Sequence, residues 1–132
     1  MSIEKKVNIM VVDDEEIVRS SLTSWLEEDG YDVEAVESGK KALERLPAKS
    51  WNLMLVDLKM PGMDGLQLME EVRKTHPEML VIIMTAYATV DTAVKAMKQG
   101  AYDYFVKPFN PDDISITIRK IVDHHKLVQE NL

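Results

Sequence analysis

The stretch MLVDLKMPGMDG (54–65) decides the fold, because an apolar run typical of a buried strand ends there on one aspartate, Asp57, just before a Pro-Gly turn. A carboxylate at the tip of a buried strand is costly to desolvate unless another group compensates its charge. The same pattern occurs in VNIMVVDDEE (7–16), where the apolar run ends on Asp13 and Asp14. Three carboxylates therefore follow two predicted strands, and they need a common explanation.

The composition limits the class of protein. The chain has 132 residues, of which 45% are hydrophobic and 30% charged, the balance of one globular domain. Its 23 acidic and 16 basic residues give a net charge of −7, which argues against direct binding of nucleic acid and is compatible with a cation site. The absence of cysteine excludes disulfides and thiolate zinc sites.

Two features indicate a cytoplasmic protein without a membrane segment. The N-terminus, MSIEKKVNIM, lacks the long apolar core of a signal peptide. The most apolar run, MLVIIMTAYA (79–88), is about half of the ~20 residues that a membrane-spanning helix needs. We therefore expect cytoplasmic localisation.

Short apolar runs alternate with segments of helical spacing along the whole chain. Three of the runs are almost continuously apolar, which is typical of parallel strands covered on both faces. Strict alternation of strand and helix predicts one α/β domain with an open parallel sheet and right-handed crossovers. The predicted strands are 7–12, 31–36, 53–58, 80–86 and 103–107.

The predicted helices have recognisable ends and faces. Ser38, Asp64 and Thr89 are typical N-caps, and Gly30 and Gly100 are typical stops. Periodicity predicts that one stripe of each helix faces the sheet. For the first helix this stripe is Ile17, Leu22, Trp25 and Leu26; for the helix after Thr89 it is Ala93, Val94 and Met97.

Five polar residues end four of the predicted strands: Asp13, Asp14, Asp57, Thr85 and Lys107. In an open α/β sheet, ligands bind beyond the carboxyl ends of the strands, so we expect these side chains to form one site. Clustered carboxylates suit magnesium (Mg²⁺), and a lysine with a hydroxyl can hold phosphoryl oxygens. Because a carboxylate can itself be the nucleophile, the residue types predict Mg²⁺-dependent phosphoryl transfer onto Asp57.

With these motifs in place, the sequence resembles the receiver domains of bacterial two-component response regulators. The resemblance rests on VVDDEE, LMLVDLKMPGMDGL, IIMTAYA and YDYFVKPF, which occur in the family's order and spacing. It implies a single doubly wound, CheY-like parallel sheet of five strands in the order 2-1-3-4-5, with five helices of which the last is extended.

The resemblance also implies a role for each site residue. Asp57 is the residue that a sensor histidine kinase phosphorylates. Asp14, Asp57 and the backbone carbonyl of Lys59 coordinate Mg²⁺, and Asp13 acts through a bound water. Lys107 pairs with the phosphoryl oxygens.

Further implied roles concern switching. Thr85 moves toward the phosphoryl group and Tyr104 turns inward behind it, which reshapes the face built from the fourth helix, fifth strand and fifth helix. Lys59 and Tyr87 occupy positions that tune hydrolysis of the phosphoryl group, and the peptide bond before Pro108 is cis.

Each of these residues also has a simpler interpretation. Asp13 and Asp14 are common caps for a helix beginning near Glu15. Tyr104 in its aromatic run is also typical of core packing, and Lys107 alone is typical of a surface. For His124 and His125 an exposed helix face is the favoured interpretation, because adjacent helical residues point about 100° apart and do not easily share a metal.

Two other function classes compete with a phosphorylation switch. Haloacid dehalogenase-type phosphatases also use an aspartyl nucleophile, but position 59 here is Lys where they carry their acid. A phosphate-independent interaction module usually lacks one of the key residues, all of which are present. We therefore expect a switch that catalyses only its own phosphoryl uptake and autodephosphorylation, not a turnover enzyme.

The C-terminus indicates further domains. We assign residues 1–122 to the receiver and 123–132 to an extension of the last helix that begins a linker. The TAYATVDTAVKAMKQGAYDYFVKPF segment (85–109) most resembles receivers of NtrC-like, sigma-54-dependent activators, which carry an output AAA+ ATPase and a DNA-binding domain. We expect a homodimer through the last helix, the 4-5-5 face or both, because apolar residues continue at heptad spacing. The stripe is Ile114, Ile118, Ile121, His125, Val128 and Leu132.

Overall fold

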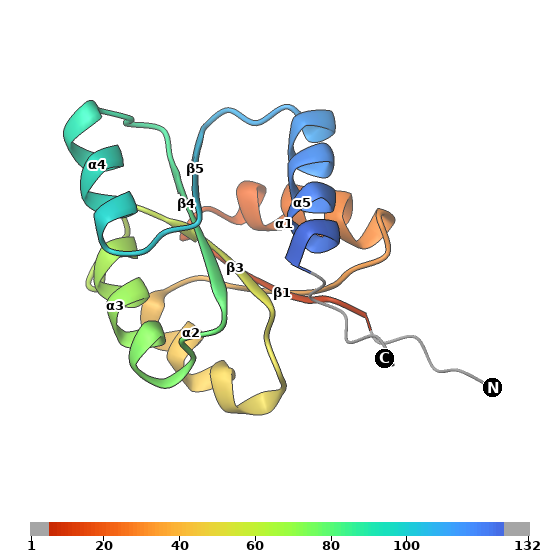
Figure 1. Cartoon of the computed structure of the whole chain (residues 1–132), viewed down its shortest axis with the longest axis horizontal. Coiled ribbons are helices and arrows are strands. Elements are labelled where there is room, and N and C mark those ends of the chain that lie inside the picture. The colour runs from red at the N-terminus through yellow and green to blue at the C-terminus, as the bar shows by residue number, and fades with distance from the viewer. Residues whose placement is uncertain (1–5, 126–132) are drawn as a thin grey trace.

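The computed structural model describes residues 6–125 and contains a five-stranded parallel sheet in the order β2-β1-β3-β4-β5 (Figure 1). The strands are β1 (Asn8–Val12), β2 (Asp32–Val36), β3 (Leu53–Asp57), β4 (Leu80–Thr85) and β5 (Asp103–Val106). The helices are α1 (Glu16–Glu28), α2 (Gly39–Arg45), α3 (Gly65–Thr75), α4 (Val90–Lys98) and α5 (Pro111–His125), with a 3-10 turn, η1 (Leu46–Ala48), after α2. The predicted fold, strand order and number of helices are confirmed.

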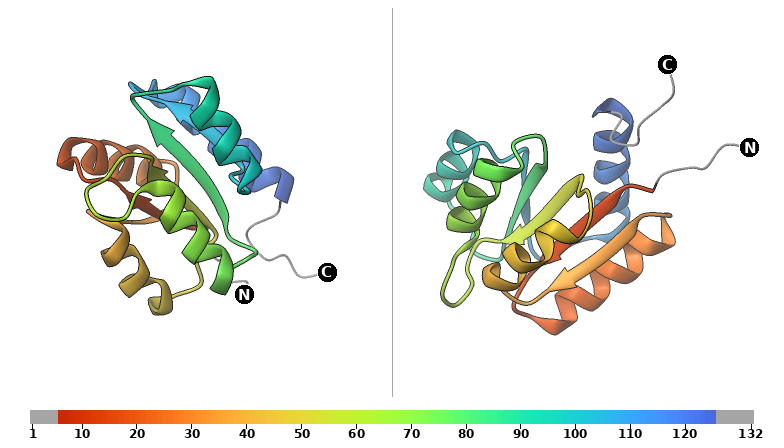
Figure 2. Two further views of the ribbon diagram at one scale, coloured as in Figure 1. Left: turned by 90° about the vertical axis from the view of Figure 1, so that its left-hand side faces the viewer. Right: turned by 90° about the horizontal axis from the view of Figure 1, so that it is seen from below.

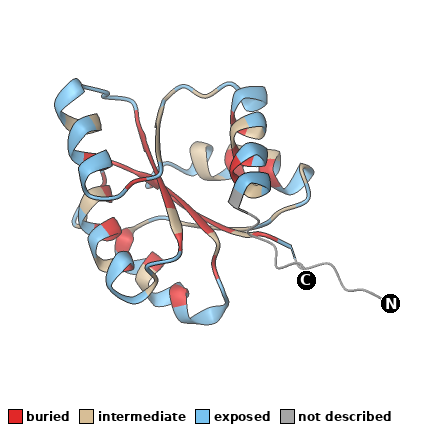
Figure 3. Cartoon of the chain, in the orientation of Figure 1, coloured by how far each residue is buried: buried red, intermediate tan, exposed pale blue. Residues whose placement is uncertain are grey.

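Helices cover both faces of the sheet, with α2, α3 and α4 on one face and α1 and α5 on the other (Figures 1 and 2). Alternate residues of β3 serve the two layers: Met54 and Val56 pack toward the first group of helices, and Leu53 and Leu55 toward the second. β1, β3 and β4 are buried almost throughout, which explains why their sequences are nearly continuous in apolar residues (Figure 3).

The predicted helix ends are confirmed. The side chains of Ser38, Asp64 and Thr89 each accept the backbone N–H of the residue three positions later. Gly30 and Gly100 follow α1 and α4 with φ of 95° and 105°, a left-handed conformation in which glycine ends a helix at no steric cost.

The predicted inward faces are wrong in two places. Ile17 is 73% exposed, although Leu22 and Leu26 in the same helix are buried as expected. In α4, Val94 and Met97 are 45% and 47% exposed, and the buried residue is Ala96. Ala93, Val94, Ala96 and Met97 form one apolar side of α4 that is wider than its contact with the sheet, so periodicity alone does not determine which part of that side contacts the sheet.

Helix α5 lies against the sheet through the first part of its predicted stripe. Ile114, Ile118 and Ile121 are buried in the layer shared with α1. The positions that would extend this stripe, Val128 and Leu132, lie outside the described residues, so the extension stays a prediction. Among the described helices, none is long and apolar enough to cross a membrane.

Candidate functional site

The carboxyl ends of four neighbouring strands bring the predicted site residues together. Asp13 follows β1, Asp57 ends β3, Thr85 ends β4, and Lys107 follows β5. Because β1, β3, β4 and β5 are adjacent and parallel, these ends lie at one edge of the sheet. Asp13, Asp57 and Thr85 are nearly inaccessible to solvent, with exposures of 0%, 6% and 1%, whereas Asp14 is exposed at the rim.

Lys107 is the centre of the charge network. Its Nζ lies 2.7 Å from Asp13 Oδ2, 3.1 Å from Asp57 Oδ1 and 3.4 Å from Glu15 Oε1. Its side chain is only 10% exposed, so the ammonium is held by these carboxylates rather than by bulk water. The hypothesis of an ordinary surface lysine is therefore wrong.

Both carboxylate oxygens of Asp13 already have partners. Oδ1 accepts the Glu15 backbone N–H at 2.9 Å, and Oδ2 accepts from the Lys107 ammonium at 2.7 Å. Asp13 thus closes a local turn onto Glu15, the N-cap residue of α1, and it also orients Lys107; since the N-cap of α1 makes no side-chain cap hydrogen bond, the simpler interpretation of Asp13 as a helix cap is wrong. These two tasks favour contact with a metal through a water rather than directly.

The three aspartates fit a hard divalent cation. One oxygen each from Asp13, Asp14 and Asp57 lie within 4.8 Å of one another, and one of the three residues is open to solvent. Mg²⁺ prefers a few carboxylates together with waters, and the solvent-exposed rim leaves room for those waters. The donor set of this edge therefore suits Mg²⁺.

The electrostatics of Asp57 point to the same conclusion. Burial raises the pKa of Asp57 to about 6, and the charge of Asp13 adds to this effect, while Lys107 partly opposes it. Burial alone would lower the pKa of Lys107, but its hydrogen bond with Asp13 and the charges of Asp13 and Asp57 outweigh this and raise it. Lys107 is therefore a fixed cation, and it does not fully offset the negative charge around Asp57.

Gly65, the first residue of α3, permits a close approach behind Asp57. A Cβ at this position would lie 2.5 Å from the carbonyl oxygen of Asp57, far inside van der Waals contact. The Gly65 N–H also donates to the Leu58 carbonyl at 2.9 Å. The start of α3 is thus held against the end of β3, which fixes the backbone of the candidate acceptor.

The two candidate switch residues are each held by a local hydrogen bond. Thr85 Oγ1 accepts the backbone N–H of Tyr87 at 2.9 Å. The hydroxyl of Tyr104, half-buried on β5, lies 2.8 Å from Thr92 Oγ1 in the first turn of α4. The Lys107–Pro108 peptide bond is cis, as the resemblance implies.

A comparison with known protein families agrees with this geometry. The family description "Response regulator receiver domain" matches residues 9–119, which includes every residue of the site. The chain belongs to the response regulator receiver family. The resemblance drawn from the four motifs is confirmed.

Relatives of this receiver place it with the NtrC type. It is 39% identical over 127 residues to the transcriptional regulatory protein ZraR of Klebsiella oxytoca, covering 93% of this chain and 28% of that protein. It is 38% identical over 122 residues to the DNA-binding transcriptional regulator NtrC of Escherichia coli K12, covering 92% and 26%. The chain therefore spans little more than a quarter of these relatives.

Solved structures support the fold independently. A CheY-like response regulator receiver domain from Methanospirillum hungatei superposes with a TM-score of 0.87 at 33% identity, covering 92% of this chain and 98% of that one. At this coverage the whole receiver fold is shared.

Two contacts at the site were not predicted from the sequence. Glu15, which directly follows the acidic pair, is the third ion partner of Lys107, and its place in the chain was the available signal. Lys59 lies over the ring of Tyr87, with its Nζ 4.8 Å from the ring centroid. That contact joins the β3–α3 loop to the β4–α4 loop, and no local pattern indicates it.

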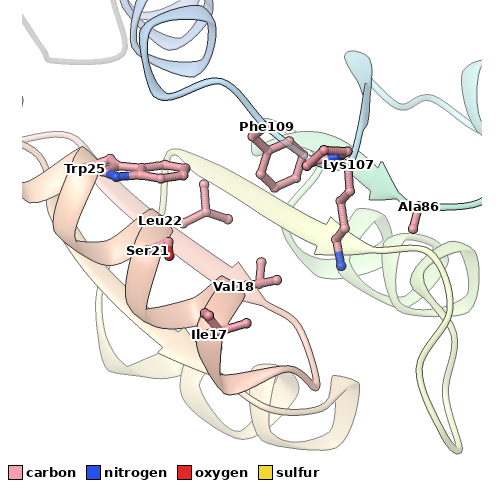
Figure 4. A pocket seen from close by; sticks show the side chains of 9 residues that line it. Ile17, Val18, Ser21, Leu22, Trp25, Ala86, Lys107 and Phe109 are labelled. Carbon is pink, nitrogen blue, oxygen red and sulfur yellow. The ribbon is translucent and has the colours of Figure 1, made fainter.

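An apolar groove of about 400 Å³ adjoins the site. It runs between α1 and the segment after β5, and Trp25, Leu22 and Phe109 line it (Figure 4). Ile17 lies at its margin, which accounts for an exposed isoleucine beside the site. Lys107, whose ammonium binds Asp57, also lines the groove, so groove and site are continuous.

Proposed function

We propose that this receiver accepts a phosphoryl group on Asp57 from a phosphohistidine of a sensor histidine kinase, in a reaction that requires Mg²⁺. The observation that carries this proposal is the buried Asp57 with Lys107 on one oxygen and Asp13 and Asp14 beside it. A carboxylate placed this way combines a nucleophile, a fixed cation and a cation-binding edge.

The transfer step exchanges one bond to phosphorus for another. A carboxylate oxygen of Asp57 forms a P–O bond while the P–N bond of the phosphohistidine breaks, and the imidazole takes up a proton from water as it leaves. With a pKa of about 6, Asp57 is mostly ionised at pH 7 and supplies the lone pair. The Lys107 ammonium neutralises charge that develops on a phosphoryl oxygen.

Asp14, Asp57 and the backbone carbonyl of Lys59 would hold Mg²⁺, with Asp13 acting through a bound water. When bound, Mg²⁺ supplies charge neutralisation for the phosphoryl oxygens. Two observations support these different roles. Asp14 is exposed, so its carboxylate is available to a metal, whereas both oxygens of Asp13 already have protein partners.

The groove beside the site supports a protein donor. A phosphohistidine reaches Asp57 only if its own protein covers the surroundings of the site. The apolar lining next to Lys107, with Ile17 73% exposed at its margin, provides a surface that a partner helix would bury.

Phosphorylation would act as a conformational switch. Thr85 leaves the Tyr87 N–H to bind the phosphoryl group, and Tyr104 turns inward into the space behind it. The phosphoryl group favours the state in which it gains the Thr85 contact, so the change is a population shift. Autodephosphorylation would reset the switch, and Lys59 and Tyr87 would tune its rate.

The output would be a change in self-association. Val90, Val94 and Met97 are exposed on α4 beside β5, where a second copy would cover them. We propose homodimerisation through this face, the last helix or both, with control of output ATPase and DNA-binding domains in a longer cytoplasmic protein. Light scattering with and without beryllofluoride tests this: a monomer in both states at high concentration would contradict it.

Intact mass spectrometry after incubation with acetyl phosphate tests the acceptor. We expect one added phosphoryl group that depends on Mg²⁺, is lost in Asp57→Asn and persists in Asp64→Asn, a matched exchange at the N-cap of α3. If no adduct accumulates, Mg²⁺-dependent binding of beryllofluoride replaces it as the readout. Absence of both in the native chain would contradict the proposed function.

A further inference from the structure

Thr92, in the first turn of α4, links the cap of that helix to the sheet. Its Oγ1 lies 3.2 Å from the Thr89 backbone N, 2.9 Å from Thr89 Oγ1 and 3.1 Å from the Thr89 carbonyl oxygen. The same oxygen lies 2.8 Å from the hydroxyl of Tyr104, twelve residues away on β5. One hydroxyl thus serves both a local cap and a long-range contact.

The valence of a hydroxyl, which has one proton to donate and accepts two hydrogen bonds, limits this network. Thr92 Oγ1 accepts the Thr89 N–H, because an amide is only a donor. In its contacts with Thr89 Oγ1 and with the Tyr104 hydroxyl, either oxygen can be the donor. The Tyr104 hydroxyl thus shares a hydrogen bond with a side chain that also belongs to the cap of α4.

We propose that this Tyr104–Thr92 hydrogen bond is a latch that stabilises the resting conformation, and that Thr92 is a positioning residue for the phosphorylation switch. The inference rests on the proposed function. Inward rotation of Tyr104 withdraws its hydroxyl from Thr92, so the bond exists only in the resting state. Both side chains are half-buried, so breaking their hydrogen bond costs free energy. We expect the bond to break only when new contacts of the phosphoryl group offset that cost.

The latch also couples the site to α4. Ile83 of β4 pairs with Tyr104, and Thr85 lies two residues further along the same strand. Thr85 and Tyr104 therefore project to the same face of the sheet, the face that α4 covers. Releasing Thr92 frees the first turn of α4, which carries Val90, exposed and next to the cap.

The test is the affinity of the whole chain for beryllofluoride in Mg²⁺, measured by calorimetry in Thr92→Val. Valine has the shape of threonine without the hydroxyl, so the latch is lost with little change in packing. We expect about two- to ten-fold tighter binding, because a net hydrogen bond no longer opposes the shift to the bound conformation. Thr92→Ser, which keeps the hydroxyl, should bind as the native chain does.

A double-mutant cycle with Tyr104→Phe separates the latch from the cap. In the Tyr104→Phe background, Thr92→Val should change the affinity less than about two-fold, because the shared bond is already gone. An equal effect in both backgrounds, or unchanged or weaker binding in Thr92→Val alone, would overturn the latch. A native chain that does not bind beryllofluoride would instead overturn the proposed function and the latch together.

Discussion

Helices α3 and α4 are neighbours on the same face of the sheet, yet they are attached to it very differently (Figures 1 and 2). Helix α3 fully buries Leu68, Met69 and Val72, each of which contributes about 1.5–3 kcal/mol by burial. Of the residues of α4, all of which the structure describes, only Ala96 is buried. Helix α3, which follows the β3–α3 loop, is firmly packed, and α4, which follows the β4–α4 loop, is not.

This difference assigns separate tasks to the two sides of the site. Under the proposed function, Asp57 would hold still while a phosphoryl group is transferred, and α3 begins immediately behind it. Thr85 and Tyr104 would move, and they adjoin a helix that is held by small side chains and a capping network. Elements that move in a switch are drawn from the less stable parts of a fold.

The largest expected effect compares one residue type on the two helices. Met69→Ala in α3 should lower the free energy of unfolding by about 2–5 kcal/mol, because a fully buried side chain is lost and a cavity remains. Met97→Ala in α4 should change it by less than about 1 kcal/mol, because Met97 is 47% exposed. Urea unfolding measures both, and equal losses would contradict the difference between the helices.

The second effect compares the first residues of the same helices. Gly65→Ala should cost about 1–3 kcal/mol, because its Cβ would overlap the backbone of Asp57 unless the start of α3 shifts. Val90→Ala, at a position 79% exposed, should stay within about 0.5 kcal/mol. A Gly65→Ala variant as stable as the native chain would show that α3 is not fixed against β3.

The strand ends and the helix caps could be predicted from the sequence, and the packing of α4 could not. Asp57 and Asp13 were recognisable because a charge at the end of an apolar strand has few structural uses. The N-caps were recognisable because their hydrogen bonds are local. The face of α4 was not, because Val94 and Met97 satisfy helical periodicity as well as Ala96 does, and the choice depends on the space beside β5.

Contacts between distant segments escaped the sequence for the same reason. The Tyr104–Thr92 bond and the Lys59–Tyr87 contact join residues whose spacing along the chain carries no pattern. The motifs did predict which residues lie at the carboxyl ends of the strands. They therefore predicted which residues meet at one edge of the sheet, but not which neighbours those residues bind.

A third prediction uses the charge on the fixed side. The pKa of Asp57 rises from 3.8 to about 6 on folding, so the folded state binds a proton more tightly and the contribution of Asp57 to stability falls as pH rises through this range. Without Mg²⁺, Asp57→Asn should therefore be more stable than the native chain by about 1–2 kcal/mol at pH 7. This difference is smaller than the full pKa shift would give, because water at the rim of the site screens the charge of Asp57.

The pH dependence of this stability difference distinguishes it from the effect of removing an ordinary surface charge. The advantage of Asp57→Asn should shrink as pH falls from 7 toward 4, because native Asp57 then takes up its proton. Thermal unfolding across this range measures it, with the exposed Asp32→Asn as a control that should change little. A variant that is less stable than the native chain at every pH would contradict uncompensated charge at Asp57.

The smallest effect concerns a side-chain contact between the β3–α3 loop and the β4–α4 loop. Lys59 belongs to the β3–α3 loop and Tyr87 to the β4–α4 loop, and their cation–π contact at an exposed site should be worth about 0.5 kcal/mol. A double-mutant cycle of Lys59→Met and Tyr87→Leu should recover that coupling in unfolding free energy, and Tyr87→Phe should keep it. The absence of coupling would mean that the two loops move independently. The boundary between the fixed and the movable part of the molecule would then run through the site, between Lys59 and Tyr87. Coupling of this size would mean that the β4–α4 loop is tied to the β3–α3 loop by a contact weak enough for the proposed phosphorylation to break.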